Sequence, residues 1–110
     1  MKTLSPFALR VYRVVARIPP GSVATYKNIA LLINCKSPRA VASVLAKNPF
    51  TPEIPCHRVV SSHLNLTGYK GSSAPNCLAQ KRKLLESEGV EFDTQGRVLP
   101  NHLWKITIPK

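Results

Sequence analysis

The sequence predicts a small, mainly α-helical domain that contains a helix-turn-helix and a short β element. A chain of 110 residues suits one compact domain, so we expect residues 1–110 to form a single domain. Apolar residues recur at helical spacing in several segments. Ser5-Pro6 and Ser37-Pro38 are both typical of an N-cap followed by proline at the first helical position.

The first helix is expected from Pro6 to about residue 17. Its buried face would be made of apolar side chains at helical spacing, namely Phe7, Val11, Val14, Val15 and Ile18. Pro19-Pro20-Gly21 would end it, because proline cannot continue a helix.

Two short helices around a turn would follow. Thr25 can cap a helix over about 26–33, and Ser37-Pro38 opens another that ends by Asn48-Pro49. This arrangement is typical of a helix-turn-helix whose last helix reads DNA. One face of that helix carries mostly small side chains: Arg39, Ala42, Ser43 and Ala46. Small residues permit the close approach of a large partner, but packing against another helix explains them equally well.

The second half of the chain is less regular. Residues 49–76 are expected to form a long loop with one short buried stretch at Arg58-Val59-Val60, and loops of this length are usually functional. A helix is expected over 77–88, followed by Gly89 at C′. Its leucines (Leu78, Leu84, Leu85) would face inward, and Gln80, Lys81 and Lys83 outward. A strand pair is expected around 90–92 and 97–99 with Gly96 turning, and Leu103-Trp104 should pack back on the body.

The charge is strongly asymmetric. Sixteen Lys and Arg oppose five acidic residues, and residues 1–83 contain Glu53 as their one acid. Such a cationic region predicts a polyanionic partner, with nucleic acid ahead of an anionic membrane because no helix carries aromatic anchors on an apolar face. No apolar run is long enough to span a bilayer and the N-terminus has no apolar signal core, so we expect an intracellular protein of the cytoplasm, nucleoid or nucleus, with no membrane partner.

Three widely spaced cysteines argue against a disulfide framework, and the lack of a Cys-x-x-Cys pair argues against structural zinc. Pro55-Cys56-His57-Arg58 is the most informative string, because an adjacent imidazole and guanidinium can favour a thiolate. Adjacency alone favours the plainer alternative of a small buried cysteine beside a surface histidine. Cys35 is expected to serve packing or to lie at the surface. Cys77 opens a helix, whose N-terminus can favour a thiolate, but we expect no chemical role for it. The separate His63 and His102 are expected to be solvated.

A longer set of motifs favours a reactive Cys56 over the plainer alternative. The motifs are Gly21-Ser22-Val23-Ala24-Thr25-Tyr26, Arg39-Ala40-Val41, Asn48-Pro49, Ile54-Pro55-Cys56-His57-Arg58-Val59-Val60, Gly68-Tyr69-Lys70-Gly71 and Leu84-Leu85-Glu86-Ser87-Glu88-Gly89. Together they resemble the O6-alkylguanine-DNA alkyltransferase family over about residues 6–89. The resemblance implies the winged-helix-like helix-turn-helix of the family's C-terminal catalytic domain.

The resemblance also implies a catalytic set. Cys56 would be the nucleophile and final acceptor, and His57 would deprotonate it through a bridging water. Glu88 would orient and charge-balance His57 in a relay of the triad kind. Asn48 would form the hinge between the reading helix and the active-site turn, and Arg58 would be an ion-pair partner to an acid of the last helix.

Residues for the substrate follow from the same resemblance. Tyr26 would press on the DNA backbone and donate a proton to the leaving guanine. Arg39 would fill the stack after the base is extruded, with Ala40, Ser43 and Lys47 also at the minor groove. The flipped base would be held by the substrate-pocket residues Val59, Tyr69, Lys70, Gly71 and Arg58.

The implied function is repair by direct reversal. One alkyl group would pass irreversibly from O6-alkylguanine in duplex DNA to Cys56, with O4-alkylthymine as a second candidate substrate. No metal or organic cofactor is required, and the protein is expected to be a monomer.

Two departures from the family pattern leave alternatives open. We expect this protein to be the catalytic domain alone, without the extra N-terminal domain of many family members, and its tail, Leu103-Trp104-Lys105, resembles the short alkyltransferase-like proteins. In that subgroup a tryptophan usually replaces the nucleophile, and the protein flags the lesion for excision repair; Cys56 favours transfer instead. The loop Ser72–Asn76 is longer than usual, which affects the expected pocket.

A sequence-specific helix-turn-helix regulator is a further alternative. The outer face of the expected reading helix lacks the Asn, Gln and second Arg that usually read base edges.

Overall fold

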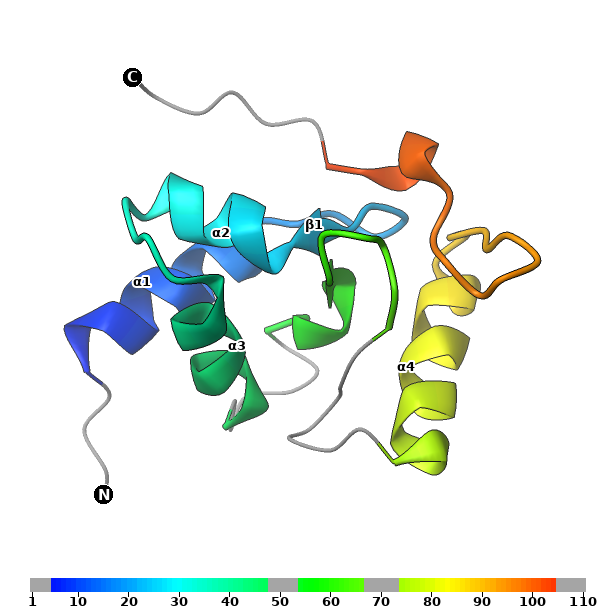
Figure 1. Ribbon diagram of the computed structural model, residues 1–110, viewed down its shortest axis with the longest axis horizontal. Coiled ribbons are helices and arrows are strands. Elements are labelled where there is room, and N and C mark those ends of the chain that lie inside the picture. The colour runs from blue at the N-terminus through cyan, green and yellow to red at the C-terminus, as the bar shows by residue number, and fades with distance from the viewer. Residues whose placement is uncertain (1–4, 48–53, 67–73, 105–110) are drawn as a thin grey trace.

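The computed structural model of the protein describes residues 5–47, 54–66 and 74–104. Short helices dominate, and one two-stranded sheet links segments that are far apart in the sequence (Figure 1). In chain order the elements are the helix α1 (Pro6–Val15), strand β1 (Ala24–Thr25), helices α2 (Tyr26–Leu32) and α3 (Pro38–Ala46), the 3-10 turn η1 (Cys56–Arg58), strand β2 (Val59–Val60), helix α4 (Pro75–Ser87) and the 3-10 turn η2 (Pro100–His102). The mainly helical prediction with a short β element is confirmed.

Helix α1 begins where the sequence predicts. The Ser5 side chain accepts a hydrogen bond from the backbone N–H of Ala8 at 3.1 Å, and Pro6 occupies the first turn. The helix ends at Val15, two residues earlier than expected. Its last turn tightens there, because the Ile18 amide bonds to the Val15 carbonyl three residues back.

Helices α2 and α3 form the predicted helix-turn-helix. Thr25 caps α2 through the Asn28 amide at 3.0 Å, and Ser37 caps α3 through the Ala40 amide at 3.2 Å. The turn between them contains a residue with positive φ, Asn34, whose short polar side chain tolerates that conformation. Both helices pack on each other and on α1.

The sheet differs from the expected one. Strands β1 and β2 pair in parallel, with Ala24 opposite Val59. The predicted strand pair near the C-terminal end is instead one antiparallel bridge between Phe92 and Val98, with Gly96 turning at φ +78°. Of the buried stretch expected at 58–60, Val59 and Val60 form the strand β2, while Arg58 belongs to η1, and the partner strand β1 is about 35 residues away in sequence.

Helix α4 starts at Pro75, two residues before the predicted start, and Gly89 follows it at φ +91° as expected for C′. Two predictions about side chains here are wrong. Lys81 was expected outward but has no exposed surface, and His102 was expected to be solvated but bridges the Gly21 carbonyl at 3.0 Å and the Glu91 amide at 3.1 Å. Leu103 forms a bridge with Val23 and Trp104 packs on the core, as predicted.

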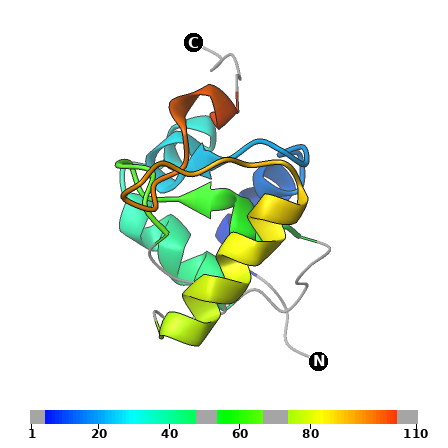
Figure 2. The same cartoon turned by 90° about the vertical axis from the view of Figure 1, so that its right-hand side faces the viewer.

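Strand β2 separates two groups of buried side chains. Successive residues of a strand point to opposite faces, so Val59 joins the cluster of α1–α3 and Val60 joins the cluster around Leu85 and Val98. Figure 1 shows α1–α3 on one side and α4 on the other, with η1 and β2 between them, and Figure 2 shows α4 beside β2. Of the helices within the described ranges, none is long and apolar enough to cross a membrane.

Candidate active site

The turn η1 places Cys56 and His57 between the two halves of the molecule. The Cys56 amide bonds to the Ile54 carbonyl at 2.8 Å, the Arg58 amide bonds to Pro55 at 2.9 Å, and the Val59 amide closes the turn on Cys56. Cys56 is 6% exposed and His57 is 2% exposed. The expected surface position for His57 in the plainer alternative is thus excluded, and the thiol and imidazole lie in a partly desolvated environment.

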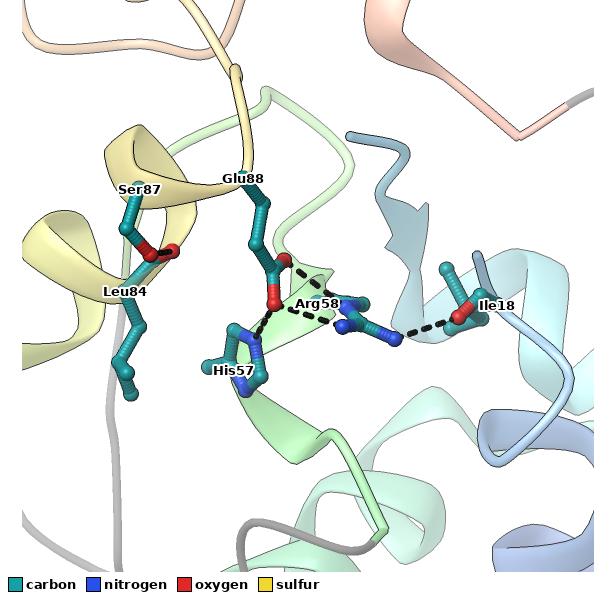
Figure 3. Close-up of polar contacts among 6 residues, drawn as sticks. All are labelled: Ile18, His57, Arg58, Leu84, Ser87 and Glu88. Atoms are coloured by element: carbon teal, nitrogen blue, oxygen red, sulfur yellow. Dashed lines mark hydrogen bonds and ion pairs between the residues drawn. The ribbon is translucent and has the colours of Figure 1, made fainter. Parts of the chain in front are cut away.

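Glu88 lies at the end of α4 and reaches back to this turn (Figure 3). His57 Nε2 is 3.0 Å from Glu88 Oε2, and Arg58 donates to both carboxylate oxygens, from Nε at 2.9 Å and from Nη2 at 2.6 Å. A forked pair of this kind fixes the carboxylate in one plane and orientation. The structure thus pairs His57 with Glu88, and the acid of the last helix that Arg58 contacts is the same Glu88.

Arg58 also ties this cluster to the far half of the protein. Its Nη1 donates to the Ile18 carbonyl at 2.7 Å, just beyond the end of α1 (Figure 3). One guanidinium therefore links the end of α4, the turn η1 and the end of α1. Arg58 and Glu88 side chains are 14% and 17% exposed, so the pair is mostly shielded from solvent.

The electrostatics define the protonation states of the pair. Burial lowers the pKa of His57, and the hydrogen bond and charge of Glu88 only partly offset this effect. Burial raises the pKa of Glu88, but the hydrogen bonds from Arg58 and His57 outweigh burial and place it below its ordinary value. A carboxylate can only accept, so neutral His57 donates from Nε2 and its basic nitrogen is Nδ1.

Two further titratable groups, Tyr12 and Lys81, interact electrostatically with Cys56, and neither was predicted as a site residue from the sequence. Tyr12 on α1 donates to the Val44 carbonyl at 3.1 Å; burial raises the pKa of Tyr12, and so does the Cys56 thiolate. Lys81 on α4 donates to the Val59 carbonyl at 2.7 Å. Helical spacing could have identified Lys81 as inward-facing, because it lies on the same face of α4 as Leu78 and Leu85.

Helix α3 presents the other predicted group of residues. Arg39, Ser43 and Lys47 are exposed, and Ala40 is half-buried beside them. Tyr26, the first residue of α2, is half-buried and packs on the core cluster that contains Cys56. On the small-residue face of α3, Arg39, Ser43 and Ala46 are exposed and Ala42 is half-buried. Within the described part of the chain this face is therefore mostly open to solvent, which favours an external partner over an internal helix.

Several predicted residues are placed differently or lie outside the description. Val59, expected to wall the substrate pocket, has no exposed surface and belongs to the core. Asn48, Tyr69, Lys70 and Gly71 lie outside the described residues, and their roles stay predictions. Among the residues that are described, no group of three His, Cys, Asp or Glu is arranged to hold a metal ion.

The other cysteines differ from Cys56. Cys35 is half-buried, and its sulfur accepts a hydrogen bond from the Ser37 amide at 3.4 Å, so it belongs to the α2–α3 turn. Cys77 is half-buried in the first turn of α4 and packs on the core cluster. Within the described segments, Cys56 is the cysteine that adjoins a buried His–carboxylate pair. The arrangement suits nucleophilic chemistry by sulfur, with a neutral imidazole next to it as proton acceptor.

Known proteins resemble this chain in both sequence and fold. The family model described as the DNA binding domain of 6-O-methylguanine DNA methyltransferase matches residues 6–90. The methylated-DNA–protein-cysteine methyltransferase of Methanothermobacter thermautotrophicus is 44% identical over 86 residues, which is 78% of this chain and 46% of that protein. The chain spans about half the length of the curated relatives it matches.

Two solved DNA complexes have the same fold. Mycobacterium tuberculosis OGT in complex with DNA matches with a TM-score of 0.71 and 36% identity, over 78% of this chain and 51% of that chain. S. pombe Atl1, in complex with damaged DNA containing O6-carboxymethylguanine, matches with a TM-score of 0.74 and 27% identity, over 96% of this chain and 100% of that chain.

Proposed function

The chain belongs to the 6-O-methylguanine DNA methyltransferase family, and we propose that it transfers an alkyl group from O6 of guanine in duplex DNA to the sulfur of its own Cys56. The observation that carries this proposal is the buried relay in which His57, 3.0 Å from Glu88, adjoins the cysteine. Attack on an alkyl carbon requires a soft anion, and a thiolate beside a proton acceptor supplies one.

The proposed reaction balances as a single displacement. The Cys56 proton passes through a water to Nδ1 of His57, and the resulting imidazolium is held by the Glu88 carboxylate. The thiolate then forms a carbon–sulfur bond as the carbon–O6 bond breaks, and guanine receives that electron pair together with a proton from Tyr26. The phenolate of Tyr26 regains a proton from water, and His57 gives up the proton that it took from Cys56 to the resulting hydroxide, so both groups return to their starting states. The product is a thioether, which nothing in the proposed site reverses, so each molecule reacts once.

DNA would be bound on the exposed face of α3. O6 of a stacked guanine cannot be reached in line by a side chain, so the base must leave the duplex. We propose that Arg39 fills the gap, and that the small side chains at Ala40 and Ser43 let α3 approach a minor groove. Lys47 and the excess of basic residues would add phosphate contacts.

The remaining predicted roles complete this proposal. Asn48 would connect α3 to the active-site turn, and the segment Tyr69-Lys70-Gly71 would bind the extruded base beside Arg58. No metal or organic cofactor enters the scheme. Residues 1–110 would act as one domain and as a monomer.

A second function is favoured by one observation. S. pombe Atl1, whose complex contains O6-carboxymethylguanine, matches 96% of this chain with 100% of its own chain. We therefore keep as the alternative a protein that binds O6-alkylguanine without transfer and recruits excision-repair proteins. Both functions require lesion binding, so transfer to sulfur is what separates them.

The test is the intact mass of the protein after incubation with a duplex containing one O6-methylguanine. The proposal predicts a gain of one methyl group, located on Cys56 by peptide mapping. Cys77→Ser should still gain it, and Cys56→Ala should not. An unchanged mass together with tight, lesion-selective binding would support the non-catalytic function instead.

A further inference from the structure

Lys81 is the most deeply buried charged side chain in the described part of the molecule. It lies in the middle of α4 with 0% of its surface exposed, and its Nζ donates to the Val59 carbonyl at 2.7 Å. Val59 directly follows the turn η1, and the Val59 amide bonds back to Cys56. The ammonium group is therefore attached to the backbone that shapes the thiol's position.

The charge of Lys81 acts on the relay as well as on the backbone. Burial lowers the pKa of Lys81 to about 8, and the Cys56 thiolate opposes that shift. Lys81 also contributes to lowering the pKa of His57. Among the residues that the structure describes, Tyr12 on α1 and Lys81 on α4 interact electrostatically with Cys56, and His57 follows it directly in η1. Of these three groups, Lys81 is the one that is cationic near neutral pH.

A buried ammonium is expensive for folding. With a pKa lowered to about 8, Lys81 is mostly charged at neutral pH although burial has removed most of its hydration. A methionine of similar length would fill the same space without this penalty. Tethering Val59 does not by itself require a charge, because a neutral amide can donate the same hydrogen bond. The positive charge therefore needs a separate explanation.

We propose that Lys81 is a positioning residue whose ammonium group supplies the counter-charge that favours the Cys56 thiolate, while its hydrogen bond to Val59 fixes the active-site turn. Burial disfavours a thiolate, and a nearby cation offsets this effect in a medium of low dielectric. The inference rests on the proposed role of Cys56 as nucleophile. It adds to the relay a group that acts on the sulfur electrostatically, from the side of α4.

The test uses iodoacetamide, which reports thiolate formation without DNA. The rate of Cys56 carboxamidomethylation is followed against pH by peptide mapping in the full chain. Lys81→Met removes charge and tether, whereas Lys81→Gln removes the charge but retains an N–H donor. Both should move the pH midpoint for Cys56 upward by about one unit, which lowers the rate at pH 7 about tenfold. Lys83→Met, an exposed neighbour on α4, should match the wild type.

A structural role alone predicts the opposite pattern. The Lys81→Met protein would then unfold at a lower temperature in circular dichroism, with its Cys56 midpoint unchanged, and an unchanged midpoint in either folded neutral variant overturns the proposal. If neither variant folds, the reciprocal measurement decides. The ammonium of Lys81, observed by NMR, should titrate at lower pH in Cys56→Ala than in the wild type, and an identical titration overturns the proposal.

The outcome is separable from that of the proposed function. Iodoacetamide reacts with any accessible thiolate, so a shifted midpoint supports Lys81 even if the protein transfers no methyl group from DNA. Methyl transfer by the wild type with an unshifted midpoint in the neutral variants would retain the function and reject the role of Lys81.

Discussion

The turn η1 and helix α3 are adjacent regions with opposite physical character. At η1 the charged groups are buried and mutually bonded: His57 and Arg58 both contact Glu88, and Arg58 extends to Ile18. On α3 the polar side chains of Arg39, Ser43 and Lys47 are exposed. Groups held in a dry network are coupled to folding and to proton transfer, whereas exposed groups are coupled to a partner. Substitutions in the two regions should therefore affect different measurements.

The largest effect is expected for Glu88→Gln. This change leaves Arg58 without its forked partner and His57 without the carboxylate that balances its charge, so the free energy of unfolding should fall by about 2–3 kcal/mol. Methyl transfer should slow about a hundredfold, because His57 becomes a poorer proton acceptor. Urea denaturation and single-turnover kinetics measure the two effects.

Glu86→Gln is the matched control on the same helix. Glu86 forms an exposed ion pair with Arg82 at 3.4 Å, and such pairs contribute little to stability. Affinity of the Glu88→Gln protein for duplex DNA should stay near that of the wild type. A loss of DNA affinity as large as the loss of rate would contradict the separation of the two regions.

Arg39→Ala should produce the next largest effect, in binding. Loss of the arginine proposed to occupy the vacated stack should weaken binding to a duplex with O6-methylguanine about tenfold, measured by fluorescence anisotropy. Stability should change by less than about 0.5 kcal/mol, because Arg39 is exposed. The pH dependence of Cys56 alkylation by iodoacetamide should be the same in Arg39→Ala as in the wild type.

Arg13→Ala provides the comparison for Arg39. Arg13 is an exposed arginine on α1, so its removal changes the net charge equally but leaves α3 intact. Equal losses of affinity in the two variants would mean that Arg39 acts through charge alone, and the assignment of α3 as the reading helix would lose its main support.

The pH dependence of stability should sharpen the description of the buried region. Folding lowers the pKa of His57 below its ordinary 6.5, so as pH falls through that value the unfolded chain takes up a proton before the folded protein does. Stability should therefore decrease on acidification. Folding also lowers the pKa of Glu88 below 4.5, so its contribution is present above that value and is lost as pH falls further.

Denaturant melts between pH 7.5 and 4 measure this dependence. His57→Gln should remove the loss of stability that begins near pH 6.5, while the loss caused by protonation of Glu88 at lower pH should remain. A wild-type protein that becomes more stable as pH falls through 6.5 would contradict the lowered pKa of His57.

The sequence predicted features that depend on neighbouring residues. The caps at Ser5, Thr25 and Ser37 are local hydrogen bonds, and each is present at its predicted place. The motif resemblance also placed Glu88 with His57, a contact between residues 31 positions apart that no local pattern gives, whereas it assigned Arg58 only to an acid of the last helix.

Contacts between residues far apart in the chain could not be predicted from the sequence. The parallel pairing of Ala24 with Val59 joins two-residue strands, which are too short to show a periodic pattern. Lys81 was assigned to the outer face because lysine is almost never fully buried, although its spacing relative to Leu78 and Leu85 indicated the core. His102 has no pattern around it, and its two backbone partners, at Gly21 and Glu91, are set by the fold alone.

The smallest effect is expected for Lys47→Met, and it lies in the salt dependence of binding. Lys47 is exposed at the end of α3, where a phosphate contact would release about one counterion. The plot of log affinity against log salt should become shallower by about 0.9, while selectivity for the lesion and the Cys56 profile stay constant. Lys83→Met on α4 should leave the slope unchanged. Lys81→Met should have the opposite effects: the pH midpoint of Cys56 alkylation should change and the salt slope should not. The reason is that a buried lysine interacts with a buried anion, whereas an exposed lysine interacts with the phosphates of DNA. Equal slopes for the wild type and Lys47→Met would remove Lys47 from the DNA-binding face and confine that face to the first two turns of α3.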